Sequence, residues 1–571
     1  MKITTACTIA AALAFTAAAG ASPSGVPAEL KRADAPDLIL YNGRISTVDT
    51  DNSTVEAIAI RDGMIIATGR SGPVRALARQ GTRLVHLNGR RVLPGLIDGH
   101  LHGMRNAYHC FTQTVRLDLV TSRTAALSAY AAKAASLPAG RWIWTTSGGW
   151  NVNQLDTPVV FTFSELSAVA PNNPLWIQGS GFAGARVNQA ALTALGLTVG
   201  SPGVVLDASG RPTGQLTGAA STAANQAIIA QLDTLTLEER AACLADYMRD
   251  VNRRGMTAWK DAGGNQAPWG AGAGEIGDRF NVREPTMHLY RSGGFTARIA
   301  YHDMSNYQGF KQVAVDTRTR VGPLGDDMFR YMGPGEDTMA TDPDYPDYTR
   351  YAAFKRFSVE THVGNLNAIL DGFEAGNAVH PISQLIWSIA HPGNGQPDDT
   401  QLARASALGI GFTLTFSSVR NGQTGPRFRS TMQSGVRMCL ASDAMNVAPY
   451  APFQNLWYVT TGQTLLPGVP GVPESERLTR QQALRHATVE CAWFLGQEGR
   501  LGSLEVGKHA DLIVLSDDYF SVRDEAIKDI RSVLTVVGGR IVHAEAEFAT
   551  LNQPKKRPKG EKRGDDDDDD D

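Results

Sequence analysis

One segment dominates this 571-residue sequence: Val92-Leu93-Pro94-Gly95-Leu96-Ile97-Asp98-Gly99-His100-Leu101-His102. It has the pattern of an apolar strand that ends in His-x-His. Side chains two positions apart on a strand point to the same side, so both imidazoles can reach one metal ion. Because imidazole suits Zn²⁺ and similar divalent ions, the segment predicts a divalent metal site at a strand end. Structural histidine pairs are also common, so this pattern needs support from elsewhere in the chain.

Two further histidines end strand-like runs. His362 closes the run that begins at Phe357, and His391 closes the run that begins at Leu385. Each histidine by itself is more often a hydrogen-bonded core or loop residue than a ligand. The chain has only 12 histidines, however, and four of them fall at apparent strand ends. This recurrence favours a shared site.

An acidic residue follows another apolar run, Gly435 to Ser442, and this residue is Asp443. Metal ions lower the pKa of a bound water towards ~7, which makes it nucleophilic near neutral pH. Such a reaction still needs a base that takes the water proton and gives it to the leaving group. A carboxylate beside the metal suits both tasks, although a helix N-cap is the simpler explanation for Asp443 alone.

Strands and helices alternate over several hundred residues between the two ends of the chain. The pattern predicts amphipathic helices over Leu237–Arg253, Ala352–Arg356, Asn365–Ala375 and Thr479–Leu495. Alternation of this kind favours a parallel α/β architecture, and a barrel is one main option. In a barrel the chemistry takes place where the strands end, which is where the histidines fall.

Both ends of the chain are rich in short strands and turns. Near the N-terminus, Leu38–Leu40 precedes an Asn-Gly turn, and Ala57–Ile60 connects through a turn to Met64–Ile66. Near the C-terminus, Ala510–Leu515 and a hairpin with a Gly538-Gly539 turn have the same character. The two ends of a chain often lie close together, so these segments can form one small sheet domain.

The order His-x-His, His, His, Asp on successive strand ends resembles the amidohydrolase superfamily. The surrounding sequence resembles its amidohydrolase-3 branch, which contains YtcJ-like and N-substituted formamide deformylase-like proteins. Further matching blocks are Asp207–Gly214, Arg254–Thr257, Leu478–Thr488 and, most specifically, Gly502–Leu512. The resemblance covers about Ala35 to Val542.

This resemblance implies a TIM-type (β/α)8 barrel with a small composite β-sandwich domain from both chain ends, which is an α/β fold. The sandwich would span residues 35–90 and 500–545, and the barrel 91–499 with an insertion around 112–250. The implied metal ligands are His100 and His102 from strand 1, His362 from strand 5 and His391 from strand 6. Asp443 would follow strand 8, and the expected cofactor is one or two divalent ions, with Zn²⁺ as the first candidate.

A two-metal site also needs an anionic bridge, often a Glu or a carboxylated Lys. Glu336 is the first candidate for this bridge, and Lys260 is the second. Trp150 and Arg429 are candidate substrate-binding residues, with Trp144 and Asn151 nearby. The branch tends to carry a His before an Asn-Ser-x-Ala-Leu segment, and the corresponding Phe182–Leu192 lacks it, so the substrate contacts must differ there.

Composition and the chain ends limit the other possibilities. The chain is 42% hydrophobic and 19% charged, with a net charge of −3, which is ordinary for a globular enzyme and unlike a nucleic-acid-binding domain. Residues 1–21 have the pattern of a signal peptide, which predicts an exported protein without a membrane span. Residues 552–571 are expected to form a disordered charged tail. The four cysteines after residue 21 are expected to be buried free thiols.

We therefore expect a metal-dependent hydrolase that cleaves a C–N bond of the amide type in a small molecule, with Asp443 as general base and acid. Two alternatives remain open. One is an ester, lactone or phosphotriester hydrolase that uses the same site. The other is a non-catalytic exported protein that binds metal or a small molecule. The sequence leaves open a homo-oligomer.

Overall fold

The computed structural model describes most of the chain. The residues described are 35–552, except for 109, 111, 119, 146–150, 179–183, 264–281, 304–323, 337–339, 394–396, 416–424, 445–448 and 467–470. The predicted signal peptide, the charged tail, Trp150 and Cys7 lie outside the described residues. Within the described part, no helix is long and apolar enough to span a membrane.

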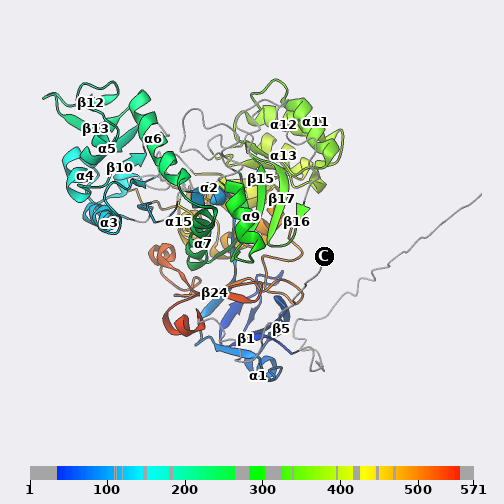
Figure 1. Ribbon diagram of the computed structural model, residues 1–571. Coiled ribbons are helices and arrows are strands. Elements are labelled where there is room, and N and C mark those ends of the chain that lie inside the picture. The colour runs from blue at the N-terminus through cyan, green and yellow to red at the C-terminus, as the bar shows by residue number, and fades with distance from the viewer. Residues whose placement is uncertain are drawn as a thin grey trace, which may run out of the picture.

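Two largely parallel sheets form the central part of the molecule (Figure 1). The first has the strand order β16 (Leu324–Gly325), β17 (Phe329–Pro334), β15 (Arg298–Asp303), β14 (Met256–Asp261) and β8 (Leu96–Leu101). The second has the order β18 (Glu360–His362), β19 (Ser388–Ala390), β20 (Gly411–Thr415) and β21 (Arg437–Ala441). All pairs are parallel except β16 with β17.

Short pairs of backbone hydrogen bonds, outside the ladders of either sheet, connect the two sheets to each other. At one junction, Ser358 N donates to Met332 O at 3.3 Å, between the ends of β17 and β18. At the other, Asp443 N donates to the carbonyl of His100 at 2.8 Å, between β21 and β8. A second hydrogen bond supports each junction: His362 N donates to Glu336 O at 3.2 Å, and His102 N donates to Ala444 O at 3.3 Å. The two sheets are therefore joined at both edges, and β8 and β21 lie side by side.

Gly99 allows the close approach of β8 to β21. A Cβ atom at this position would lie 2.3 Å from the Sγ atom of Cys439 on β21, so no larger residue fits without a shift. All six residues of β8 are buried, as expected of a strand covered on both faces. The glycine between Asp98 and His100 thus has a packing role that sets the position of the His-x-His segment.

Helices follow most of these strands. They are α2 (Gly103–Tyr108), α7 (Leu237–Arg253), α9 (Glu284–Arg291), α11 (Tyr345–Lys355), α12 (Leu366–Asn377), α13 (Asp399–Leu408), α14 (Phe428–Gln433), α15 (Pro452–Thr461), α16 (Arg480–Arg485) and α17 (Val489–Phe494). The predicted helix Leu237–Arg253 is confirmed, and a capping box between Thr236 and Glu239 fixes its start. The expected helix at Asn365 begins one residue later because Asn365 is its N-cap. Helix α11 begins earlier than expected, at Tyr345.

The prediction of one continuous helix over Thr479–Leu495 is wrong, because the segment divides into α16 and α17. The carbonyl oxygens of His486 and Ala487, in the break, accept hydrogen bonds from Leu440 N on β21 and Ile97 N on β8, both at 2.9 Å. A continuous helix would use these carbonyls for its own hydrogen bonds. The break therefore provides backbone acceptors between the two neighbouring strands.

Strands from both ends of the chain share one sheet, which lies below the central sheets in Figure 1. Its order is β24 (Arg540–Ala544), β23 (Ser532–Val537), β22 (Leu512–Leu515), β7 (Arg91–Pro94), β2 (Arg44–Ser46) and β3 (Thr54–Val55). A second sheet has the order β5 (Met64–Gly69), β4 (Ala57–Arg61), β1 (Leu38–Tyr41) and β6 (Arg83–His86), with α1 (Ser71–Arg75) beside it. One hydrophobic cluster contains side chains from both sheets, among them Leu40, Ile58, Val92 and Leu512.

The segment between α2 and α7 forms a separate five-stranded sheet at the upper left of Figure 1. Its order is β12 (Val204–Leu206), β13 (Pro212–Leu216), β11 (Ala185–Val187), β10 (Leu175–Gln178) and β9 (Ile143–Thr145). The accompanying helices are α3 (Arg123–Ala135), α4 (Phe163–Val169), α5 (Gln189–Ala194) and α6 (Gly218–Asp233). Since β8 and β14 are neighbours in the central sheet, this segment interrupts a connection between adjacent strands.

The expectation of free thiols is wrong. Cys110 forms a disulfide with Cys243, and Cys439 forms one with Cys491. The paired cysteines are 133 and 52 residues apart in the sequence. This wide spacing gave no indication of the pairing, because only the fold brings the cysteines together. The first disulfide joins the two ends of the inserted segment. The second fixes β21, which leads into Asp443, to α17.

We expect loss of the Cys110–Cys243 disulfide to destabilise the inserted segment. A bridge over a long loop restricts the unfolded chain, so the paired replacement Cys110→Ser/Cys243→Ser lowers the free energy of unfolding by about 2–4 kcal/mol. Urea denaturation without reductant measures this, and wild-type protein in reductant serves as the comparison. Identical midpoints for the variant and the oxidised wild type would contradict the prediction.

Candidate metal centre

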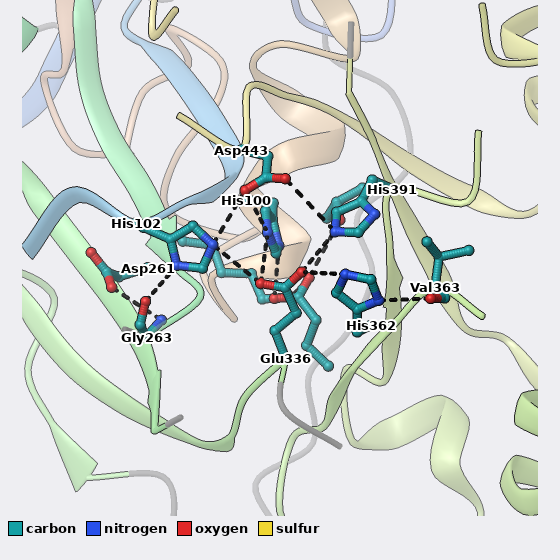
Figure 2. Close-up of polar contacts among 12 residues, drawn as sticks. His100, His102, Asp261, Gly263, Glu336, His362, Val363, His391 and Asp443 are labelled. Atoms are coloured by element: carbon teal, nitrogen blue, oxygen red, sulfur yellow. Dashed lines mark hydrogen bonds and ion pairs between the residues drawn. The ribbon is translucent and has the colours of Figure 1, made fainter. Parts of the chain in front are cut away.

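Six side chains converge where the central strands end (Figure 2). His100 belongs to β8 and His102 follows it directly, while His362 ends β18 and His391 follows β19. Glu336 comes two residues after β17, and Asp443 two residues after β21. Carboxyl ends of parallel strands meet at one edge, so residues from distant parts of the sequence become neighbours.

Glu336 lies between the histidines, with one oxygen on each side. Its Oε2 atom is 3.1 Å from His102 Nε2 and 3.4 Å from His100 Nε2. Its Oε1 atom is 2.7 Å from His391 Nε2 and 3.6 Å from His362 Nε2. The two oxygens of one buried carboxylate therefore face two separate pairs of histidines.

Asp443 closes the centre on the side of β21. Its Oδ1 atom lies 3.2 Å from His102 Nε2 and 3.6 Å from His100 Nε2, and its Oδ2 atom lies 3.8 Å from His391 Nε2. Asp443 and His391 both have positive φ angles, of 51° and 37°, which are unusual for residues other than glycine. Backbone hydrogen bonds from Asp443 N to His100 O and from His391 N to Thr413 O hold these conformations.

Backbone carbonyls orient two of the imidazole rings. His102 Nδ1 donates to Gly263 O at 2.5 Å, and His362 Nδ1 donates to Val363 O at 2.6 Å. A carbonyl oxygen can only accept, so Nδ1 carries the proton in both rings and the Nε2 lone pair faces the centre. This is the arrangement that supporting hydrogen bonds give to metal-binding histidines.

The donor set fits a divalent metal ion. Three overlapping groups have ligand atoms within 4.8 Å of one another: His100, His102 and Glu336; His100, His391 and Asp443; and Glu336, His362 and His391. Both ring nitrogens of His100 are buried without a regular hydrogen bond, although carboxylate oxygens lie close to them. Burial would raise the pKa of Glu336, but the surrounding imidazoles hold it well below its usual value. Imidazole nitrogens and ionised carboxylates that converge in this way suit Zn²⁺ and similar ions.

Two further buried aspartates, Asp98 and Asp261, hold backbone groups next to the metal-binding histidines. Neither was predicted from the sequence as part of the site. Asp98 Oδ1 accepts from His100 N at 3.0 Å and from Ser442 N at 3.2 Å, which ties β8 to β21. Burial raises the pKa of Asp98 to about 6. Asp261 Oδ1 accepts from Gly263 N at 3.1 Å, and the carbonyl of that glycine orients His102. A buried acidic residue within an apolar strand was the available signal.

The second bridge candidate, Lys260, does not join these ligand groups. Its Nζ atom donates to Glu360 Oε1 at 2.8 Å and to Ser388 Oγ at 2.7 Å. Both charged side chains of this pair are completely buried. Burial would raise the pKa of Glu360, but Lys260 and His100 hold it below its usual value. Glu360 is also a residue that the sequence analysis missed.

The substrate-binding candidates that the structure describes have other observed roles. Arg429 donates from Nε and Nη2 to the carbonyl oxygen of Arg477, at 3.0 and 2.5 Å, so its guanidinium supports a loop instead. Trp144 lies on β9, buried in a hydrophobic cluster that joins the inserted segment to the central sheet. Asn151 caps the short 3₁₀ helix Val152–Gln154. Trp150 is outside the described residues.

Comparison with known proteins agrees with this geometry. The sequence model of the amidohydrolase family matches residues 83–543. The chain belongs to the amidohydrolase family. The family predicted from the sequence is therefore confirmed.

Two curated relatives align with this chain over nearly their whole length. An N-substituted formamide deformylase of Arthrobacter pascens is 24% identical over 88% of this chain and 97% of its own. The amidohydrolase YtcJ of Bacillus subtilis, itself a provisional assignment, is 25% identical over 89% of this chain and 99% of its own.

A solved structure of an uncharacterized metal-dependent hydrolase from Pyrococcus horikoshii aligns with a TM-score of 0.59 and 19% identity, over 86% of this chain and 99% of that one. This amidohydrolase thus has a TIM-barrel-type α/β fold. Family membership and the six-residue centre together support a divalent metal cofactor and hydrolysis of a small molecule.

Proposed function

We propose that this amidohydrolase cleaves a C–N bond of the amide type in a small molecule, at a centre of two divalent ions bridged by Glu336. Zn²⁺ is the first candidate for both ions. The observation that carries the proposal is the position of Glu336, whose two carboxylate oxygens face separate pairs of histidines. A carboxylate whose two oxygens face separate ligand groups can hold two ions close together, as in two-metal hydrolytic sites.

The residues divide between two ion positions. His100, His102 and Asp443 would hold one ion together with Glu336 Oε2, and His362 and His391 would hold the other together with Glu336 Oε1. When bound, such ions supply Lewis acidity towards a carbonyl oxygen and make a water molecule more acidic. The chain itself supplies the orientation of these side chains and the proton transfers.

Asp443 is suited to carry the proton. Burial would raise its pKa, but contacts with His100 and His102 hold it below the usual value of an aspartate. The carboxylate is therefore ionised near neutral pH, and its position next to the histidines lets one oxygen accept the proton of the attacking water. The same oxygen then gives this proton to the leaving nitrogen, which departs as a neutral amine when the C–N bond breaks.

An amide-type substrate is supported by the relative from Arthrobacter pascens, which is described as an N-substituted formamide deformylase. A leaving nitrogen also depends more on a proton donor than a leaving alcohol does, because an amide anion is the poorer leaving group. The retained carboxylate at Asp443 gives this dependence a structural basis. Ester, lactone or phosphotriester hydrolysis and non-catalytic binding remain the alternatives that the experiment below must separate.

The test is turnover of matched substrates by the purified full-length chain. We expect N-substituted formamides and simple amides to be hydrolysed with a higher kcat/KM than the corresponding esters and phosphotriesters. Dialysis against a chelator should abolish this activity, and Zn²⁺ should restore it. Faster turnover of esters or phosphotriesters, full activity after chelation, or no turnover of any substrate would contradict the proposal.

We also propose that the protein is exported and that its barrel follows a composite β-sandwich built from both chain ends. The boundary predicted between residues 90 and 91 moves to follow Pro94, because β7 pairs with β2 and β22; the sandwich then spans 35–94 and 500–545, and the barrel 95–499. The two disulfides support export, since such bonds persist mainly in oxidising compartments. The pairing of β22 with β7 supports the composite domain. Intact-mass measurement of the exported protein checks cleavage after residue 21.

A further inference from the structure

A buried chain of contacts links His100 to two charged residues that do not face the metal centre. Glu360 Oε2 lies 3.1 Å from His100 Nδ1. The other oxygen of the same carboxylate, Oε1, accepts from Lys260 Nζ at 2.8 Å. All three side chains are completely buried, so these contacts are not weakened by solvent.

Hydroxyl groups fix the position of Glu360. Thr413 Oγ1 donates to Glu360 Oε1 at 3.3 Å, and Ser388 Oγ lies 3.4 Å from the same oxygen. Lys260 also donates to Ser388 Oγ at 2.7 Å. Oε1 is therefore occupied by a cation and two hydroxyls, while Oε2 is the oxygen that faces His100.

The contacts also connect the two central sheets. His100 and Lys260 belong to β8 and β14 of the five-stranded sheet, while Glu360, Ser388 and Thr413 belong to β18, β19 and β20 of the four-stranded sheet. The backbone hydrogen bonds described above join these sheets only at their junctions, among the residues that the structure describes. Across the interior, Glu360 on β18 thus contacts both β8, through His100, and β14, through Lys260.

His100 differs from its neighbours in the kind of acceptor that it meets. His102 and His362 direct Nδ1 at backbone carbonyls, whereas His100 directs Nδ1 at a carboxylate oxygen. This contact has an ion-pair distance without regular hydrogen-bond geometry. An ionised carboxylate accepts but does not donate, so it would favour a proton on Nδ1 when an ion at the centre takes Nε2. The Nε2 lone pair then faces Glu336 and Asp443. A charge-assisted contact is also stronger than one to a neutral carbonyl.

We propose that Glu360 and Lys260 form a positioning pair for the metal centre. Glu360 orients the ring of His100 through Nδ1, and Lys260 holds the Glu360 carboxylate in place. This assignment rests on the proposed function, in which His100 is a metal ligand. It gives Lys260 a role that differs from the carboxylated bridge considered from the sequence. Without Lys260, Glu360 would be an uncompensated buried charge, which is strongly unfavourable.

The variant Glu360→Gln tests the pair with almost no change of shape. Lys260 can still donate to the amide oxygen of the new glutamine. The amide NH₂ group would then face His100 Nδ1. This contact favours the tautomer with a proton on Nε2, which cannot bind a metal. We expect the apparent Kd for Zn²⁺, measured by competition with a chromophoric chelator, to rise about 10–100-fold.

A double variant separates positioning from folding. Lys260→Met/Glu360→Gln removes both buried charges. We therefore expect the metal-free double variant to have a higher thermal midpoint than metal-free Glu360→Gln. Its Zn²⁺ affinity should stay weak, because no carboxylate faces His100. A pair with a purely structural role would instead regain the wild-type Kd together with the midpoint.

The matched control is Asp511→Asn. It breaks another buried ion pair, in which Arg298 Nε lies 2.7 Å from Asp511 Oδ2, at the amino end of β15. We expect a lower thermal midpoint and an unchanged Kd for Zn²⁺. Wild-type affinity in both Glu360 variants, or equal weakening by Asp511→Asn, would overturn the inference. Failure of the wild-type chain to bind Zn²⁺ would instead overturn the proposed function.

Discussion

Asp443→Asn should lower kcat for an amide substrate by about 10²–10⁴-fold, the usual contribution of a positioned general acid–base group. The asparagine side chain retains an oxygen near His102 and His391 but cannot accept the proton of the attacking water. Metal content should change much less than turnover does, because the other five ligands remain. Steady-state kinetics together with elemental analysis of the same preparation measures both quantities.

The leaving group provides an internal control for this variant. If Asp443 gives its proton to the leaving nitrogen, an anilide with a strongly electron-withdrawing ring should lose less activity than a simple amide. Such a nitrogen departs with less need for protonation. An equal loss for both substrates would limit Asp443 to activation of water, and near-wild-type turnover with intact metal would contradict its catalytic role.

Glu336→Gln should have an effect of comparable size on metal binding. The glutamine side chain has one acceptor oxygen, and its NH₂ group cannot bind a metal ion. It can serve the histidines on one side only, either His100 and His102 or His362 and His391. We expect the affinity for at least one ion to fall by more than the ~10–100-fold that is typical of supporting residues outside the ligand set.

Zn²⁺ titration of the metal-free variant measures this change, with amide turnover recorded at each step. Asp511→Asn again serves as the control, since it disturbs a buried carboxylate at the other end of the strands. If Glu336→Gln binds two ions as tightly as wild type, the bridge is assigned to the wrong residue. Lys260 would not replace it, because both of its observed contacts are to Glu360 and Ser388.

The order of the ligands along the chain was predictable because each one directly follows an apolar run. His100, His102, His362, His391 and Asp443 all stand where a strand ends, and a parallel sheet places such ends together. Glu336 was harder to identify, since Gly333, Pro334 and Gly335 interrupt the apolar run before it. Its position between the histidines depends on the end of β17, which lies in the five-stranded sheet beside β15.

The supporting residues were not predictable in the same way. Glu360 is two positions before His362, so on an ideal strand both would point to the same side. In the structure, Glu360 faces His100 and Lys260, whereas His362 lies beside Glu336. This partner arrangement depends on contacts between separate sheets. The disulfides could not be predicted from the sequence either, because their cysteines meet only after the chain has folded.

Metal content of the purified wild-type chain, measured by elemental analysis after equilibration with Zn²⁺ and removal of free ion, tests the central claim most directly. The account predicts about two tightly held ions per chain in wild type, and fewer in Glu336→Gln. A single ion in both proteins would contradict the bridging role of Glu336. No bound ion in wild type would contradict the assignment of this centre as a metal-dependent hydrolase site.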